Sequence, residues 1–315
     1  MNFEHLDLDK LKTYSLNDRN HLVSKTLLVE PEDPPGDFMA GFPEILATNN
    51  LRLLCKEGAA AYNDSRKISL AMGAHVIKCG LSLLIIDLME RGILTSVSLN
   101  GAGAIHDFEM AFCGGTSEDV LAGLRDGSFG MARETAEAVN GAAVRAADGG
   151  RGLGETLGAE IEESDLPFKH ASIVAAGARL GVPVTVHVSL GCDIVHMHPS
   201  ADGAAIGAAS MNDFRTLCSL VSSLEGGVWL NIGSSVVLPE VFLKALSVSR
   251  NLTGGPNDFL TADFDMIRHY RTQKNVVERP SGRGMHITGH HEMLVPLFRW
   301  GMILELARIE KGGEA

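Results

Sequence analysis

The chain has 315 residues, of which 45% are hydrophobic and 21% are charged, so it can build one large α/β domain or two small ones. Its formal net charge of −12 argues against nucleic acid or an anionic membrane as a partner, because both reward basic patches. The negative charge does not exclude a cationic substrate such as a polyamine. The most apolar run, residues 79–88, is too short to span a bilayer, and the first dozen residues do not resemble a signal peptide. Five scattered cysteines without a CxxC pair predict reduced thiols in a cytoplasmic protein.

Residues 1–43 are expected to form an N-terminal arm. A short helix is predicted at residues 7–16, and residues 30–36 are rich in proline and acidic side chains, which excludes regular structure there. The arm packs either on the body of the protein or on a neighbouring subunit, and its first dozen residues are as easily interpreted as a free tail. Residues 44–315 are then a single domain.

The body of the chain alternates strands with helices. Apolar patterns predict helices at residues 49–63, 74–91, 133–147, 172–180, 212–224, 239–249 and 293–309. They predict strands at residues 67–72, 95–99, 183–188, 227–232 and 258–265. This alternation is typical of an α/β fold, a mainly parallel sheet with crossover helices on both faces.

A glycine-rich turn follows the strand at 95–99 and opens the next helix. The turn consists of Asn100, Gly101, Ala102 and Gly103. Glycine lets the backbone approach a ligand, and a helix start offers free N–H groups to an anion, although many such turns need glycine for packing only. Two further strands end in small or polar residues, at 187–191 and 233–235. Ligands of open α/β sheets bind beyond the carboxyl ends of strands, so a nucleotide site is expected there.

The order of several segments resembles the deoxyhypusine synthase family, including its bacterial deoxyhypusine synthase-like branch. The segments are residues 73–91, the turn at 100–107, the strand and following residues 183–198, the strand and turn 228–237, and Thr261-Ala262 with Phe264-Asp265. The similarity extends from about residue 67 to residue 298.

This resemblance implies a Rossmann-like NAD-binding sheet, a homotetramer and active sites shared between paired subunits. The cofactor residues that it implies are Asn100, Gly101, Ala102, Gly103, Asp107, His187, Gly233, Ser234, Thr261, Ala262 and His290. His187 and His290 stand at or near positions where the family has aspartate. An acidic group at Asp107 would accept hydrogen bonds from ribose hydroxyls, which favours NAD over NADP.

The resemblance does not extend to the family's lysine nucleophile, which forms an imine with a piece of spermidine. The corresponding stretch, residues 279–286, has no lysine and no tryptophan, and an arginine cannot form the imine. Leu238-Pro239 replaces a lysine–histidine pair, and neither Lys244 nor Lys274 stands at a matching position. We therefore expect an NAD-dependent enzyme with transferase or dehydrogenation chemistry on a polyamine or related small amine, which does not make deoxyhypusine.

A second constellation suggests acid–base chemistry. His187, Cys192, Asp193, His196 and His198 lie within a dozen residues. They could bind a metal, but their spacing matches no closed zinc motif, so no metal is assigned. They could also cap the strand end, or act as acid and base. His196, His198 and Asp193 are the candidate catalytic residues, and Asp193 aligns approximately with a substrate-amine contact of the family. The alternative function is a non-catalytic sensor or scaffold that binds a nucleotide or polyamine.

Overall fold

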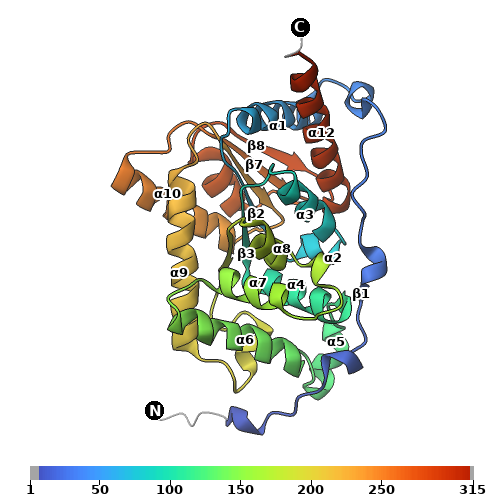
Figure 1. Cartoon of the computed structure of the whole chain (residues 1–315), viewed down its shortest axis with the longest axis vertical. Helices are drawn as coiled ribbons and strands as arrows, with labels where there is room; N and C mark the ends of the chain where they lie inside the picture. Colours follow the sequence, from blue (N-terminus) through green and yellow to red (C-terminus); the bar gives the residue numbers. More distant parts are fainter. Residues whose placement is uncertain (1–6, 313–315) are drawn as a thin grey trace.

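The computed structural model describes residues 7–312 and contains a six-stranded parallel sheet (Figure 1). The strands are β2 (Ile68–Met72), β3 (Ser96–Asn100), β5 (Val184–His187), β6 (Val228–Ile232), β7 (Leu260–Asp265) and β8 (Gly284–Thr288). Their order is β5-β3-β2-β6-β7-β8, and every neighbouring pair is parallel. This is the strand order of the Rossmann fold, in which the order reverses between the first and fourth strands, here β2 and β6. The predicted fold class is confirmed.

Helices cover both faces of the sheet. One face packs against α1 (Leu46–Asn63), α3 (Ser82–Glu90), α4 (Gly101–Cys113), α8 (Ile173–Leu180) and α12 (His291–Gly312). The other face packs against α9 (Gly203–Ser222), α10 (Val237–Thr253) and the π-helical turn η7 (Gln273–Glu278). Trp229 stacks on Phe242 of α10 with a centroid distance of 4.0 Å, and is a core residue as the sequence predicts. Two further helices, α6 (Arg133–Asp148) and α7 (Leu153–Glu163), pack around α8, α9 and β5.

The arm runs along the outside of the domain toward α1 (Figure 1). Its residues 7–43 do not join the six-stranded sheet; instead β1 (Val23–Ser24) pairs with the short strand β4 (Gly115–Thr116). The helix predicted at 7–16 is replaced by 3₁₀ turns at Leu8–Lys10 and Leu16–Asp18. Residues 1–6, the first part of the predicted arm, lie outside the described residues.

Two further elements differ from the sequence prediction for identifiable reasons. The helix predicted at 74–91 is broken into α2 (His75–Lys78) and α3 because the arm crosses it: Gly80 has φ +74°, and a Cβ there would lie 2.0 Å from the carbonyl oxygen of Leu27. The strand β8 was not predicted, since its buried residues are confined to the middle of a five-residue segment. Among residues 7–312, no helix has the length and apolar character needed to cross a membrane.

Candidate functional site

The carboxyl ends of the central strands form one edge, where the glycines allow very close packing. The Asn100 side chain accepts the N–H of Gly103 at 2.9 Å and so caps α4, and His187 lies opposite Asn100 in the β3–β5 register. Across the point where the strand order reverses, a Cβ on Gly73 would lie 2.1 Å from the carbonyl oxygen of Gly233. The predicted turns after β3 and β6 therefore belong to the same edge.

Asp193, a predicted catalytic residue, lies directly on the glycine turn. A Cβ on Gly101 would lie 1.9 Å from Asp193 Oδ2, so this glycine makes room for the carboxylate of the loop that follows β5. His196 holds that loop, because its Nδ1 accepts the N–H groups of Asp193 at 3.3 Å and Gly191 at 3.2 Å. Burial raises the pKa of Asp193, and the nearby His196 and His106 partly offset that effect.

A cavity of about 160 Å³ opens beside Asp193. It lies between the arm, α2, α4 and the loop after β5, and the polar or turn residues that face it include Arg19, Lys78, Ala102, His106, Glu109 and Asp193. Pockets for drug-sized ligands usually measure 300–1,000 Å³, so this cavity suits a small metabolite and cannot enclose a whole dinucleotide. We name it the edge-turn pocket.

A buried ion pair forms one wall of the edge-turn pocket. Glu109 accepts Arg19 Nη1 at 3.0 Å and Nη2 at 2.7 Å, and also accepts the hydroxyls of Thr135 at 3.1 Å and Thr116 at 2.5 Å. Burial favours a neutral carboxyl, but the nearby His106 and the hydrogen bonds and charge of Arg19 hold the pKa of Glu109 at about 2. Glu109 is therefore a fixed negative charge, neutralised by a residue of the arm.

The sequence analysis assigns no role to His106, which lies on α4 after the glycine turn. Its side chain is 14% exposed, and its Nδ1 lies 2.6 Å from Thr116 Oγ1. The available signal was the spacing of His106 and Glu109, three residues apart on a helix that opens from a glycine turn. The sequence carried no comparable signal for Arg19.

Asp107 has a structural role in place of the expected ribose contact. It is fully buried, and its carboxylate accepts Ser172 Oγ at 2.5 Å, the N–H of Ile173 at 2.7 Å and the N–H of Val174 at 3.2 Å. Burial raises its pKa to about 6, although these three bonds lower it in part. Asp107 thus stabilises the start of α8, and the expected preference for NAD over NADP loses its basis.

Other predicted cofactor residues lie away from the edge-turn pocket. Thr261 and Ala262 are fully buried near the start of β7, at the opposite end of the strand from the carboxyl edge, and Thr261 donates to the carbonyl of Val276 at 2.6 Å. His290 is exposed, 3.9 Å from Glu292. Ser234 lies at the carboxyl edge, where its Oγ accepts the N–H of Leu238 at 3.4 Å near the start of α10.

Two of the predicted histidines are enclosed. His198, a candidate catalytic residue, is buried with its Nε2 2.8 Å from the carbonyl oxygen of Gly130. His187 is buried beside the Thr185 hydroxyl, and burial lowers its pKa to about 4. His198 thus joins the loop after β5 to the turn at Gly130, and His187 packs within the sheet, while His196 and Asp193 remain at the turn. Among residues 7–312, no group of three or more histidine, cysteine, aspartate or glutamate side chains is arranged to hold a metal ion.

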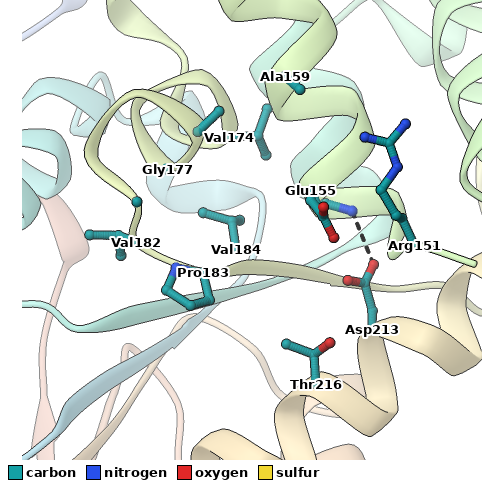
Figure 2. A pocket seen from close by; sticks show the side chains of 13 residues that line it. Arg151, Glu155, Ala159, Val174, Gly177, Val182, Pro183, Val184, Asp213 and Thr216 are labelled. Atoms are coloured by element: carbon teal, nitrogen blue, oxygen red, sulfur yellow. Dashed lines mark hydrogen bonds between the residues drawn. The ribbon is translucent and has the colours of Figure 1, made fainter. Parts of the chain in front are cut away.

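A second and larger cavity, of about 430 Å³, lies beside the edge strand β5 (Figure 2). Apolar residues such as Val174, Val182 and Val184 form much of it, and Asp213 of α9 points toward the start of α7. The Asp213 carboxylate accepts the N–H groups of Gly154 and Val186, each at 3.0 Å. Burial raises its pKa to about 7, in spite of these backbone bonds. We name this cavity the strand-edge cavity.

Together these features define a Rossmann-like α/β protein with a small polar pocket at the carboxyl edge of its sheet. No model of a known protein family matches the chain, and no curated protein matches its sequence. Solved structures do share its fold.

AgrE, solved in a ternary complex with ornithine and NAD⁺, is 16% identical with a TM-score of 0.54; the alignment covers 84% of this chain but 34% of AgrE. The chain thus spans about a third of that protein. A conserved putative LOR/SDH protein from Methanococcus maripaludis S2 is 15% identical with a TM-score of 0.55, over 90% of this chain and 76% of that one. A putative deoxyhypusine synthase from Entamoeba histolytica is 9% identical over 82% and 88% of the two chains, with a TM-score of 0.47, which is too slight to place the chain in that family. At these identities the similarity shows the fold alone.

Proposed function

We propose that the chain is an NAD-dependent enzyme that dehydrogenates a small amine, with its substrate in the edge-turn pocket. The observation that carries this proposal is the position of that pocket. It lies beyond β3, which neighbours β2, and Rossmann sheets bind dinucleotides where the strand order reverses, here between β2 and β6. The cofactor would extend along the carboxyl edge, from the turn Asn100–Gly103 toward Gly233 and Ser234.

The charges of the pocket favour an amino acid over a free polyamine. Asp193 offers a carboxylate to a substrate ammonium, while Lys78 faces the same cavity and has no ion-pair partner among residues 7–312. Lys78 suits a substrate carboxylate, whereas it would repel the second ammonium of a polyamine. The AgrE complex, which contains ornithine with NAD⁺, is in keeping with this substrate class.

Deoxyhypusine synthesis is not part of this proposal. In the stretch that lacks the family's lysine, Arg283 is engaged by Asp258 at 2.7 Å and Glu57 at 2.9 Å. Lys244 and Lys274 pair with glutamates on their own helical segments. None of these side chains is a nucleophile at the carboxyl edge.

We also propose a homotetramer with its sites near a subunit boundary. The proposal is supported by exposed apolar side chains in two regions, Leu121 and Leu124 on the helix α5 (Val120–Asp126) and Ile267, Tyr270 and Met293 after β7 and β8. Val120 of α5 also faces the edge-turn pocket. Light scattering should give about four times the chain mass, and a monomer at micromolar concentration would remove this part of the proposal.

The function is tested by calorimetry with NAD and NADP, followed by absorbance of the reduced nicotinamide after addition of L-ornithine or spermidine. Ala102→Phe should abolish the turnover, because the ring would fill the pocket from the first turn of α4. Thr216→Phe, the same kind of enlargement in the strand-edge cavity, should leave turnover unchanged. Binding of a dinucleotide without reduction by any amine would favour the alternative, a nucleotide-binding sensor or scaffold. No binding at all would reject both.

A further inference from the structure

His106 is held by a chain of hydrogen bonds that fixes the position of its protons. Glu109 accepts the hydroxyl proton of Thr116 across 2.5 Å, and Glu109 has no proton to give because its pKa is held at about 2. The Thr116 hydroxyl has one proton, and it donates that proton to Glu109. The Thr116 oxygen must therefore accept a hydrogen bond from His106 Nδ1, which lies 2.6 Å away. In neutral His106 the proton therefore lies on Nδ1.

This arrangement leaves Nε2 as the basic atom of the ring. Among residues 7–312, no hydrogen-bond partner of His106 Nε2 is found, and the side chain faces the edge-turn pocket. Ala102 faces the same pocket one helical turn earlier, so the histidine lies directly beyond the glycine turn. A carboxylate that orients the Nδ1–H of an imidazole, here through the Thr116 hydroxyl, with Nε2 free toward a ligand, is an arrangement suited to a general base.

We propose that His106 is the catalytic base of the edge-turn pocket and takes a proton from the ammonium group of the substrate, with Thr116 and Glu109 as positioning residues. This inference rests on the proposed amine dehydrogenation. Removal of the proton converts R₂CH–NH₃⁺ to R₂CH–NH₂ and His106 to its imidazolium form. The C–H bond then breaks as a hydride transfers to the oxidised nicotinamide, and the nitrogen lone pair forms the C=N bond of the iminium product, R₂C=NH₂⁺.

The surrounding charges support each step. The groups that face the ring from its own helix and the elements around it are Glu109, Arg19, Glu118, Asp193 and Lys78. Arg19 neutralises Glu109, so that pair orients His106 without adding a net charge. Asp193 can bind the ammonium while His106 takes its proton, and it would also stabilise the imidazolium afterwards.

The first test needs neither substrate nor cofactor. Nitrogen-15 NMR of the full chain, with His106 assigned by comparison with His106→Gln, should show the neutral ring protonated at Nδ1. Thr116→Val keeps the side-chain shape and removes the hydroxyl, so it should shift the ring toward the Nε2–H form that free histidine prefers. An Nε2–H form in the wild-type protein would overturn the hydrogen-bond chain and with it the proposal.

The second test measures turnover with NAD and L-ornithine. His106→Gln should retain dinucleotide affinity within about threefold and lower kcat by about 10²–10⁴, the usual contribution of general acid–base catalysis. His106→Ala should regain part of the rate when imidazole is added. Thr116→Val should lower kcat more than it changes KM, and should shift the acid limb of the pH profile.

The two ways of failing are distinguishable. Wild-type protein that binds no dinucleotide and oxidises no amine defeats the proposed function, while the NMR result still reports whether Nε2 is the free base. If the wild type turns over and His106→Gln stays within threefold of its rate, or His106→Ala is not rescued by imidazole, the catalytic role of His106 is wrong.

Discussion

The edge-turn pocket and the strand-edge cavity each contain a buried carboxylate. The pKa of one is lowered from its ordinary value, and the pKa of the other is raised. In the first, Arg19 and His106 hold the pKa of Glu109 at about 2. In the second, burial raises the pKa of Asp213 to about 7, and only backbone N–H groups of Gly154, Val186 and Leu153 oppose it. Burial is similar at the two sites, so the difference comes from Arg19, which the arm supplies, and from the nearby His106.

This contrast also separates size from chemistry. The strand-edge cavity has the larger volume, about 430 Å³ against about 160 Å³, but its carboxylate serves the backbone of β5 and α7. The smaller pocket is lined by Lys78, which has no ion-pair partner among residues 7–312, by His106 with its free Nε2, and by the Asp193 carboxylate beside the glycine turn. Side chains whose hydrogen-bonding capacity is not consumed by the fold identify a site better than volume does.

The largest expected effect comes from removing the cation. Arg19→Met should destabilise the protein by about 3–5 kcal/mol at neutral pH, because it leaves Glu109 charged, buried and without its ion-pair partner. Urea unfolding measures it. Adding Glu109→Gln to this variant should recover part of the loss, as expected for coupled neighbours. A loss below about 1 kcal/mol from Arg19→Met alone would mean that Arg19 does not hold Glu109 as described.

The pH dependence of unfolding should distinguish Asp213 from Glu109. The folded-state pKa of Asp213 is raised from 3.8 to about 7, so its stabilising contribution is complete below about pH 4 and is lost as the pH rises through about 7. Asp213→Asn should therefore gain stability relative to the wild type by roughly 1 kcal/mol per pH unit between pH 4 and 7. Exposed Asp148→Asn, at the end of α6, is the matched control and should follow the wild type.

That comparison between variants is needed because other groups titrate in the same range. The pKa of Asp107 is raised to about 6, so its contribution to the stability of the protein also falls as the pH rises. The pKa of buried His187 is lowered to about 4, so its contribution increases between about pH 4 and 6.5. Glu109 contributes above about pH 4.5 and loses its contribution as the pH falls through about 2. A difference curve for Asp213→Asn that is flat from pH 4 to 7 would contradict the assignment.

A smaller effect is expected at the glycine turn itself. Asn100→Ala removes the cap of α4 and should cost about 1 kcal/mol of stability, within the usual range of 0.5–2 kcal/mol. Asn100→Asp keeps an accepting oxygen and should remain near the wild type in thermal unfolding. If the cofactor lies against this turn, dinucleotide affinity should fall in the alanine variant more than in an N-cap variant elsewhere, such as Asp202→Ala on α9.

Sequence patterns were sufficient for five of the six strands of the parallel sheet, because buried strands and glycine-terminated helices are recorded in local periodicity. They also brought Asp193 and Asn100 to the same edge, since carboxyl ends of parallel strands meet. They could not reveal that Asp107 faces inward to the start of α8, because a carboxylate one residue from His106 in the chain looks equally suited to a ligand. The role of Arg19 could not be predicted for a related reason. Its partner Glu109 is 90 residues away in the sequence, and no local pattern encodes that contact.

The smallest effect should come from Thr216→Leu in the strand-edge cavity. Thr216 is exposed on α9, so the change should alter stability by no more than about 0.5 kcal/mol, and leucine's better helix propensity favours a slight gain. Dinucleotide binding and turnover should stay at wild-type values, because the cavity is lined by Val184 at the start of β5, whereas His187 ends that strand at the carboxyl edge. Calorimetry and thermal unfolding on one preparation measure both quantities. Loss of turnover in a stable Thr216→Leu protein would reverse the comparison and make the larger cavity part of the functional site.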